Sequence, residues 1–258
     1  MINLKACFFG IIVQTFVNTQ HYWNDNKMDL LKKTLENISA GRLLDICSGR
    51  GEFINSFSNY LTNFSEIICI DNIDLPENTF RLPNLKFLKM DAENLNFPKN
   101  YFDVITLSNS LHHLENTGKV FAQIKKIVKD NGFIIINEMF SDEQDNAQMT
   151  HVMLHHFFAG IDRETGGFHK NTFTKNQILE MVKEVFSGQI ELMDYKNAKT
   201  EGISIEYLNE VIEKILAKVK DDNIREFYKK EAEKITNNFK QYGFELATQL
   251  LLVLKQDI

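Results

Sequence analysis

The chain has 258 residues, of which 43% are hydrophobic and 25% charged, and this balance excludes a disordered or fibrous protein. A formal net charge of −6 argues against nucleic acid as the main partner, because phosphate binding needs a clustered basic surface. The cysteines Cys7, Cys47 and Cys69 lack the spacing of a zinc knuckle or a disulfide framework. We therefore expect a cytoplasmic protein from a reducing compartment, as a monomer or homodimer.

Residues 1–27 are interpreted as an N-terminal extension. Residues 6–17 form a short apolar run behind the single basic residue Lys5, and no small-x-small cleavage site follows. The run is too short to span a bilayer comfortably, and no other segment could cross a membrane. We expect the extension to pack on a domain that comprises residues 28–258; a start of synthesis near Met28 is an open alternative.

Short apolar runs then alternate with helical segments. The periodicity predicts helices over 28–38, 51–60 and 116–129. Five strand-length runs rich in Ile, Leu, Val or Phe separate them, at 42–46, 66–70, 86–90, 102–107 and 133–137. Apolar strands that alternate with helices are typical of a parallel sheet covered on both faces, so residues 28–140 are predicted to be the cofactor-binding core of an α/β fold.

The later half is more helical. Residues 141–172 contain a helical pattern that ends in Gly166-Gly167, and a further helix is predicted over 176–186 with Thr172 or Thr174 as its N-cap. A sixth strand at 189–195 precedes two amphipathic helices within 203–240, and a last apolar strand closes the chain at 246–255. We interpret 141–172 and 203–240 as helical insertions that cover the substrate.

The turn after the first strand carries the strongest chemical signal. Asp45-Ile-Cys-Ser-Gly-Arg-Gly51 joins a buried strand to a helix, and its two glycines allow a tight turn and close approach of a ligand. The helix N-terminus beyond it suits a carboxylate or phosphate. Asp71 ends the second strand, where an acid can accept hydrogen bonds from ribose hydroxyls. These features predict an adenosine-containing ligand; NAD is disfavoured because Ile54 stands where its fingerprint needs a third small residue.

Residues 42–138 resemble a class I S-adenosylmethionine-dependent methyltransferase of the kind that acts on small molecules. The motifs are Asp45 to Gly51, Asp71, Asp91-Ala92-Glu93, Ser108-Asn-Ser-Leu-His-His-Leu114 and Asp130-Asn-Gly-Phe133, in the family's order. Cys47 departs from the family, which usually has glycine there.

The resemblance implies a doubly wound, Rossmann-like sheet of seven mostly parallel strands with the last strand antiparallel. It also implies S-adenosylmethionine as cofactor, with Asp71 at the ribose and Asp91 and Ala92 at the adenine. The cofactor-binding residues carried over are Asp45, Cys47, Ser48, Gly49, Gly51, Asp71, Asn72, Asp91, Ala92 and Asn109.

Transfer of an activated methyl group has no obligatory catalytic motif, because positioning supplies most of the acceleration. His112 and His113 follow the fourth strand at the substrate-facing rim and are the catalytic candidates, since histidine titrates near neutrality. The alternative is that the pair only shapes its loop.

The insertion after the fifth strand supplies the candidate substrate-binding residues, His155, Phe158, Arg163 and His169. His151 and His155 have the i, i+4 spacing that can hold a metal, but no Glu follows His151, so the metalloprotease pattern is absent and no metal is expected.

We therefore predict an enzyme that methylates a small molecule by direct in-line displacement. Two alternatives are a non-catalytic protein that binds S-adenosylmethionine or S-adenosylhomocysteine, and an NAD-dependent oxidoreductase. The identity of the acceptor, and whether oxygen, nitrogen or carbon is methylated, stays open at this point.

Overall fold

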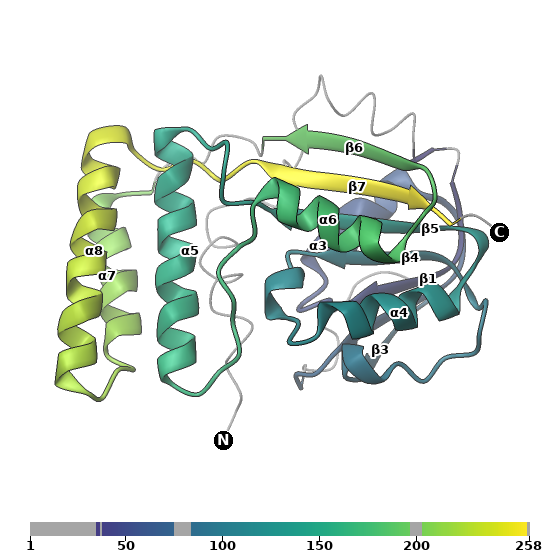
Figure 1. Cartoon of the computed structure of the whole chain (residues 1–258), viewed down its shortest axis with the longest axis horizontal. Coiled ribbons are helices and arrows are strands. Elements are labelled where there is room, and N and C mark those ends of the chain that lie inside the picture. The colour runs from purple at the N-terminus through teal and green to yellow at the C-terminus, as the bar shows by residue number, and fades with distance from the viewer. Residues whose placement is uncertain (1–34, 37, 75–83, 197–202, 257–258) are drawn as a thin grey trace.

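The computed structural model describes residues 35–36, 38–74, 84–196 and 203–256 (Figure 1). The N-terminal extension and nearly all of the helix expected over 28–38 lie outside the described residues. Within the described part, no helix combines the length and apolar character needed to span a bilayer.

One sheet of seven strands organises the described residues, in the order β3-β2-β1-β4-β5-β7-β6. Strands β1 to β5 pair in parallel, and β7 runs antiparallel to both of its neighbours, β5 and β6. The predicted fold class, with its antiparallel last strand, is confirmed. The strands are β1 (Ser39–Ile46), β2 (Thr62–Asp71), β3 (Leu85–Lys89), β4 (Phe102–Ser108), β5 (Val128–Met139), β6 (Ile190–Tyr195) and β7 (Gln249–Lys255).

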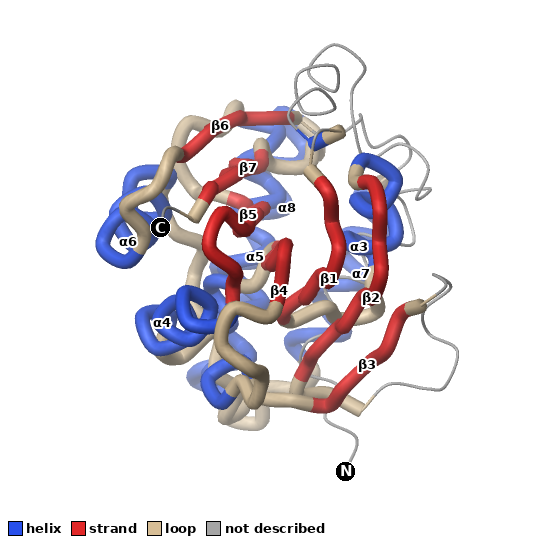
Figure 2. The backbone as a smooth tube through the Cα atoms, turned by 90° about the vertical axis from the view of Figure 1, so that its right-hand side faces the viewer, coloured by secondary structure: helices blue, strands red, loops and turns tan. Residues whose placement is uncertain are grey.

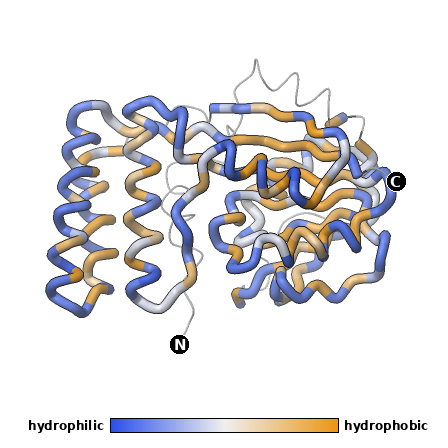
Figure 3. The backbone as a smooth tube through the Cα atoms, viewed as in Figure 1, coloured by the Kyte–Doolittle hydropathy of each residue, from blue (hydrophilic) through white to orange (hydrophobic). Residues whose placement is uncertain are grey.

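Helices cover both faces of the sheet (Figure 2). On one face, α4 (Thr117–Ile127) and α6 (Lys175–Val185) pack their apolar sides against the strands in one hydrophobic cluster. On the other face, α3 (Glu52–Phe57) continues into the 3₁₀ turn η1 (Ser58–Tyr60) and buries Ile54 and Phe57. The central strands are almost wholly apolar (Figure 3), as strands covered on both sides must be.

The helices α5 (Asn146–Glu164), α7 (Ile205–Leu216) and α8 (Asp222–Tyr242) form a separate helical layer beyond the carboxyl edge of the parallel strands (Figure 1). They bury a hydrophobic cluster of their own. A Cβ at Gly160 would lie 2.5 Å from the Tyr228 hydroxyl oxygen, so a residue without a side chain lets α5 approach α8 closely. The two helical insertions thus lie at the edge where ligands of such sheets bind, and their role as a substrate cover stays a prediction.

Two local expectations differ in detail. The predicted turn at 130–133 lies inside β5: Phe102 pairs with Val128 and Val104 with Phe133, so the intervening residues form an irregular stretch in which Asn131 has φ 62°. Thr174, not Thr172, caps α6, because its side chain and that of Gln177 form a reciprocal capping box.

The segment that follows α5 returns to the sheet over the end of β4. The backbone N–H of Lys170 donates to the carbonyl of His112 (2.9 Å), and that of Ser141 donates to the carbonyl of Phe173 (2.9 Å). His112 belongs to the 3₁₀ turn η3 (Leu111–His113). These contacts bring residues of the helical insertion onto the loop that carries the predicted catalytic pair.

Candidate active site

The loop after β1 is held by buried hydrogen bonds. Asp45 is 2% exposed and its Oδ1 accepts from the Thr106 hydroxyl on β4 (2.6 Å). The Ser48 hydroxyl donates to the Asp45 carbonyl (2.8 Å), and the Ser48 N–H donates to the Ile70 carbonyl at the end of β2 (3.0 Å). The loop is therefore fixed to both strands that flank β1.

Three residues of this loop have positive φ: Cys47 (55°), Gly49 (52°) and Gly51 (79°). Gly51 is the N-cap of α3. A left-handed conformation costs glycine little but is uncommon for a side-chain-bearing residue, so Cys47 stores backbone strain at this point. Cys47, which departs from the family motif, therefore occupies a position whose backbone conformation glycine would adopt with less strain.

Carboxyl groups on three strands and near the end of a fourth raise the pKa of the Cys47 thiol. Burial is the largest cause that raises its pKa, and Asp71, Asp45, Asp91 and Glu138 raise it further. Asp45, Asp71 and Glu138 lie in β1, β2 and β5, and Asp91 lies two residues after the end of β3. The three aspartates among them gather negative charge around one loop, which favours a cationic group bound over it.

Asp71 joins the two predicted parts of the cofactor site. Its side chain is buried, its Oδ2 accepts from the Gly49 N–H (2.9 Å), and its Oδ1 accepts from the Ile73 N–H (3.3 Å). The glycine turn and this acid are therefore in direct contact, and their roles in binding the cofactor stay predictions. Asn72, the next residue, is exposed.

Asp91 and Ala92 begin the 3₁₀ turn η2 (Ala92–Asn94). The Asp91 carboxylate accepts from the Glu93 N–H and from the Asn94 side-chain amide, each at 2.8 Å, so it caps its own turn. Ala92 is buried. A role at the adenine stays a prediction for both residues.

Asn109 lies where β4 meets the loop that carries the histidines. Its φ is 46°, its N–H donates to the Asn137 carbonyl (2.8 Å), and its side-chain oxygen accepts from the Met139 N–H (3.1 Å). It therefore fixes the start of this loop to β5.

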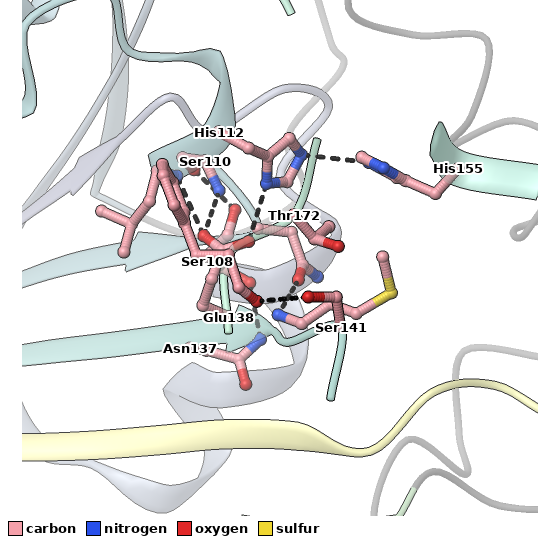
Figure 4. A network of polar contacts seen from close by, with 12 residues as sticks. Ser108, Ser110, His112, Asn137, Glu138, Ser141, His155 and Thr172 are labelled. Atoms are coloured by element: carbon pink, nitrogen blue, oxygen red, sulfur yellow. Dashed lines mark hydrogen bonds and ion pairs between the residues drawn. The ribbon is translucent and has the colours of Figure 1, made fainter. Parts of the chain in front are cut away.

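His112 and Glu138 form a buried pair (Figure 4). His112 Nδ1 lies 2.8 Å from Glu138 Oε1, and Glu138 Oε2 accepts from the N–H groups of Ser110 and Leu111, both at 2.9 Å. Burial raises the pKa of Glu138 to about 8 and lowers that of His112 to about 3. The imidazole is therefore neutral at pH 7, and its Nδ1 faces the carboxyl group.

Three further histidines pack against this pair. His155 Nε2 on α5 lies 3.2 Å from His112 Nε2. The rings of His113 and His169 have centroids 4.3 Å apart, and His169 Nδ1 lies 2.9 Å from Asp162 Oδ2. Burial is the main cause that lowers the pKa values of His113 and His155. The sequence predicted all four histidines as site residues, and the structure brings them together; their chemical roles stay predictions.

Two other predicted substrate residues lie elsewhere. Phe158 packs in the hydrophobic cluster between α5, α7 and α8. Arg163 donates to the carbonyl of His169 and to the Asn171 side chain, so it holds the return segment to α5. Their roles in substrate binding stay predictions.

The remaining histidines of α5 have structural partners. His151 Nδ1 accepts from the Ala247 N–H (3.0 Å), which fixes the entry to β7. His156 Nε2 lies 2.8 Å from the Thr172 hydroxyl, which joins α5 to the segment before α6.

Sequence reasoning missed Glu138 and Asp162. Glu138 follows the apolar run Ile134-Ile-Ile-Asn137, and an acid near the end of a buried strand is the same signal that identified Asp45 and Asp71. Asp162 gives no such signal, because its partner His169 becomes its neighbour only through the turn after α5.

Comparison with known proteins identifies the family of this chain. A family model described as a methyltransferase domain matches residues 17–249. A ubiquinone/menaquinone biosynthesis C-methyltransferase of Stutzerimonas stutzeri is 28% identical over 121 residues, which cover 41% of this chain and 47% of that protein. An uncharacterised methyltransferase of Bacillus subtilis, YcgJ, is 26% identical over 120 residues, 45% of this chain and 47% of that protein. The chain thus spans about half the length of these curated relatives.

Solved structures share the fold. The Bacillus subtilis YcgJ structure superposes with a TM-score of 0.54 at 17% identity, with 91% of this chain and all (100%) of that chain covered. A Haemonchus contortus phosphoethanolamine N-methyltransferase in complex with S-adenosyl-L-methionine gives a TM-score of 0.57 at 14% identity, with 99% and 59% covered. Since the family model covers most of the sequence, the chain belongs to the methyltransferase domain family, within the class I S-adenosylmethionine-dependent methyltransferases.

Proposed function

We propose that this enzyme methylates a small molecule bound between the carboxyl edge of the sheet and the helical layer of α5, α7 and α8. The observation that carries the proposal is the group of neutral, buried imidazoles at this edge, beside the loop that receives the cofactor. Glu138 connects the two regions, because it pairs with His112 and also acts on Cys47. The net charge of −6 favours a small-molecule acceptor over a nucleic acid.

The residues on the cofactor side fit S-adenosylmethionine. When bound, the cofactor supplies a methyl group that its positive sulfonium already activates for displacement. The carboxylates around Cys47 complement that positive charge. Asp71, fixed by the Gly49 N–H, is positioned to accept hydrogen bonds from ribose hydroxyls, and the turn from Asp45 to Gly51 offers its backbone to the amino-acid end.

On the acceptor side, the histidines meet the group that is methylated. His112 is 2% exposed and held by Glu138, whereas His113 on the same turn is half-buried. This difference in burial favours His112 as the ring that packs and His113 as the ring that faces the acceptor. A neutral imidazole can orient the acceptor and accept its proton as a general base, which contributes on the order of 10²–10⁴-fold in rate when the pKa of the base lies near the working pH.

The helical layer supplies the remaining walls of the acceptor site in this proposal. His155 and His169 reach the imidazole group from α5 and from the return segment. Relatives named for carbon and for nitrogen methylation share the fold, so the methylated element is left to experiment. We place the reaction in the cytoplasm, in keeping with the free thiols of Cys47 and Cys69 in the described residues.

The test is a screen of phenols, quinols, amines and carboxylic acids with cofactor that carries a labelled methyl group. We expect label in one acceptor class with the wild-type chain and none with His113→Ala, while cofactor affinity in the variant stays at the wild-type value. Tight cofactor binding without transfer to any of these acceptors would instead favour the non-catalytic alternative.

A further inference from the structure

Three histidines of the candidate site bring potential metal ligands together. One ring nitrogen each from His112, His113 and His169 lies within 4.8 Å of the other two. His112 and His113 come from the turn after β4, and His169 comes from the return segment after α5. The group is thus assembled from two distant parts of the chain.

Carboxylates orient two of these rings. Glu138 lies 2.8 Å from His112 Nδ1, and Asp162 lies 2.9 Å from His169 Nδ1. Each ring therefore presents Nε2 on its other side. A carboxylate on the second nitrogen is the usual arrangement around histidines that bind metals, because it fixes the tautomer and the ring plane.

His169 Nε2 supplies an independent observation. This atom is buried and has no hydrogen-bond partner among the described residues. Buried polar atoms in native proteins nearly always have a partner, so an orphaned nitrogen that a carboxylate holds in place from behind indicates a ligand absent from the chain itself.

The scaffold holds the group rigidly. The Lys170 N–H donates to the His112 carbonyl (2.9 Å), and the Lys170 ammonium donates to the carbonyls of Leu114 (2.9 Å) and Glu115 (3.1 Å). Arg163 donates to the His169 carbonyl. Hydrogen bonds therefore hold the backbone around all three histidines where the segment after α5 meets the loop after β4.

We propose that His112, His113 and His169 bind one divalent transition-metal ion, of which zinc is the best match. Imidazole nitrogens suit zinc, cobalt and nickel, and three histidines leave a coordination position open for another ligand. Nitrogens that share one zinc ion lie about 3.3 Å apart, given Zn–N bonds of about 2.0–2.1 Å, so the rings must rotate inward from their present spacing. On metal binding, His112 Nε2 would give up its contact with His155 Nε2 and bind the metal instead.

The site extends the proposed function, and its use in methyl transfer rests on that function. The open position lies at the acceptor side, where an oxygen or nitrogen of the acceptor can bind the metal and lose its proton more readily. Metal binding itself needs neither cofactor nor acceptor. The sequence predicted no metal, because the spacing of His151 and His155 concerns one helix, whereas this group is assembled across the fold.

The experiment measures metal binding to the full chain after chelation and dialysis. We expect calorimetry to show one zinc per chain, and cobalt to give the visible absorption of a low-coordinate nitrogen site. His169→Ala should abolish the stoichiometric binding of both ions. Asp162→Asn, which keeps the fold and the ligands, should weaken binding about 10–100-fold.

His156→Ala is the matched control, because His156 lies on α5 near the group but bonds to Thr172. It should keep wild-type affinity, and circular dichroism should show that each variant is folded. The proposal is overturned if the wild-type chain binds no stoichiometric zinc or cobalt, or if His156→Ala weakens binding as much as His169→Ala. Affinity for S-adenosylhomocysteine, measured without metal, should be unchanged in His169→Ala, so that a failure of the metal site is distinguishable from a failure of the proposed function.

Discussion

The cofactor side and the acceptor side of the site both use carboxylates near the ends of buried strands, yet they are built differently. Asp71 receives the Gly49 N–H from a turn that the sequence motif itself specifies. Glu138 receives two backbone N–H groups and a histidine, and that histidine meets His155 from an insertion 43 residues away in sequence. The first side is a local motif and the second is a long-range assembly. Substitutions should therefore affect the first mainly through binding and the second through stability as well.

The largest effect is expected for Glu138→Ala. The change leaves the buried N–H groups of Ser110 and Leu111 without their acceptor and the Nδ1 of His112 without its hydrogen-bond partner. The free energy of unfolding should fall by about 3–5 kcal/mol, measured by urea denaturation. Glu138→Gln keeps one oxygen acceptor and should lose less than half as much. A loss below about 1 kcal/mol in the alanine variant would show that the acceptor side does not depend on this carboxyl group.

Asp71→Ala should act mainly on cofactor binding. Loss of the hydrogen bonds proposed to the ribose should weaken S-adenosylhomocysteine affinity by about 1–3 kcal/mol, measured by calorimetry. Asp74→Ala is the matched control, because that carboxylate is exposed and pairs with Lys89 at the surface. Equal affinities of the two variants would contradict the assignment of Asp71.

Gly160→Ala tests the packing of the helical layer, at a position outside the cofactor side and the acceptor side of the site. Its Cβ would lie 2.5 Å from the Tyr228 hydroxyl oxygen and 2.8 Å from Cε1 of the same ring, so α5 and α8 must separate. Overpacking should lower the free energy of unfolding by about 1–3 kcal/mol, and the better helix propensity of alanine should restore about 1 kcal/mol of it. The net loss, measured by thermal or urea unfolding, should be about 1 kcal/mol.

Gly118→Ala is the control for this substitution. The nearest atom to its added Cβ is 3.7 Å away, an ordinary contact, so α4 should be slightly stabilised. Cofactor affinity should be unchanged in both variants. A stabilised Gly160→Ala protein would mean that α5 and α8 do not approach as closely as described.

The smallest effect concerns pH. Burial lowers the pKa of His151 from 6.5 to about 3, so the folded state keeps it neutral. The stability that this group contributes is complete above pH 6.5 and is lost as the pH falls from 6.5 toward 3, because the unfolded chain binds a proton that the folded chain excludes. Between pH 6.5 and 5.5 its share of the loss is about 1 kcal/mol.

His151→Asn removes this titration and keeps an acceptor for the Ala247 N–H. The variant should lose about 1 kcal/mol less than the wild type over the same interval, measured by urea unfolding at each pH. Identical pH profiles of the two proteins would show that His151 does not contribute to acid sensitivity.

The predicted strands show how much of the sheet can be located from the hydrophobic pattern of the sequence. Runs of Ile, Leu and Val located the strands to within a few residues, because strands buried on both faces must be apolar throughout. The hydrophobic pattern misplaced the start of the irregular strand β5. This strand begins at Val128, inside the stretch expected to be helix and turn, because Phe102 of β4 pairs with Val128 there. Pairing with a neighbouring strand is not visible in the sequence of one strand.

The candidate site divides in the same way. Asp45, Gly49 and Asp71 were predicted because each stands at a fixed place relative to a strand end, and their hydrogen bonds follow from adjacent parallel strands. Phe158 and Arg163 were selected only for their nearness in sequence to the histidines, and the turn of α5 carries them to other partners. Position on a helix does not say which face meets which neighbour.

The sequence by itself determined the parallel core, the glycine turn and the acid that faces it, because these depend on local backbone geometry and on burial patterns within a few residues. Only the tertiary structure decided that Glu138 would hold His112, that Asp162 would hold His169, and that His169 would come to lie on His113. Those contacts depend on how the helical insertion folds back over the end of β4. The packing of distant segments sets that path, and no short stretch of the chain encodes it.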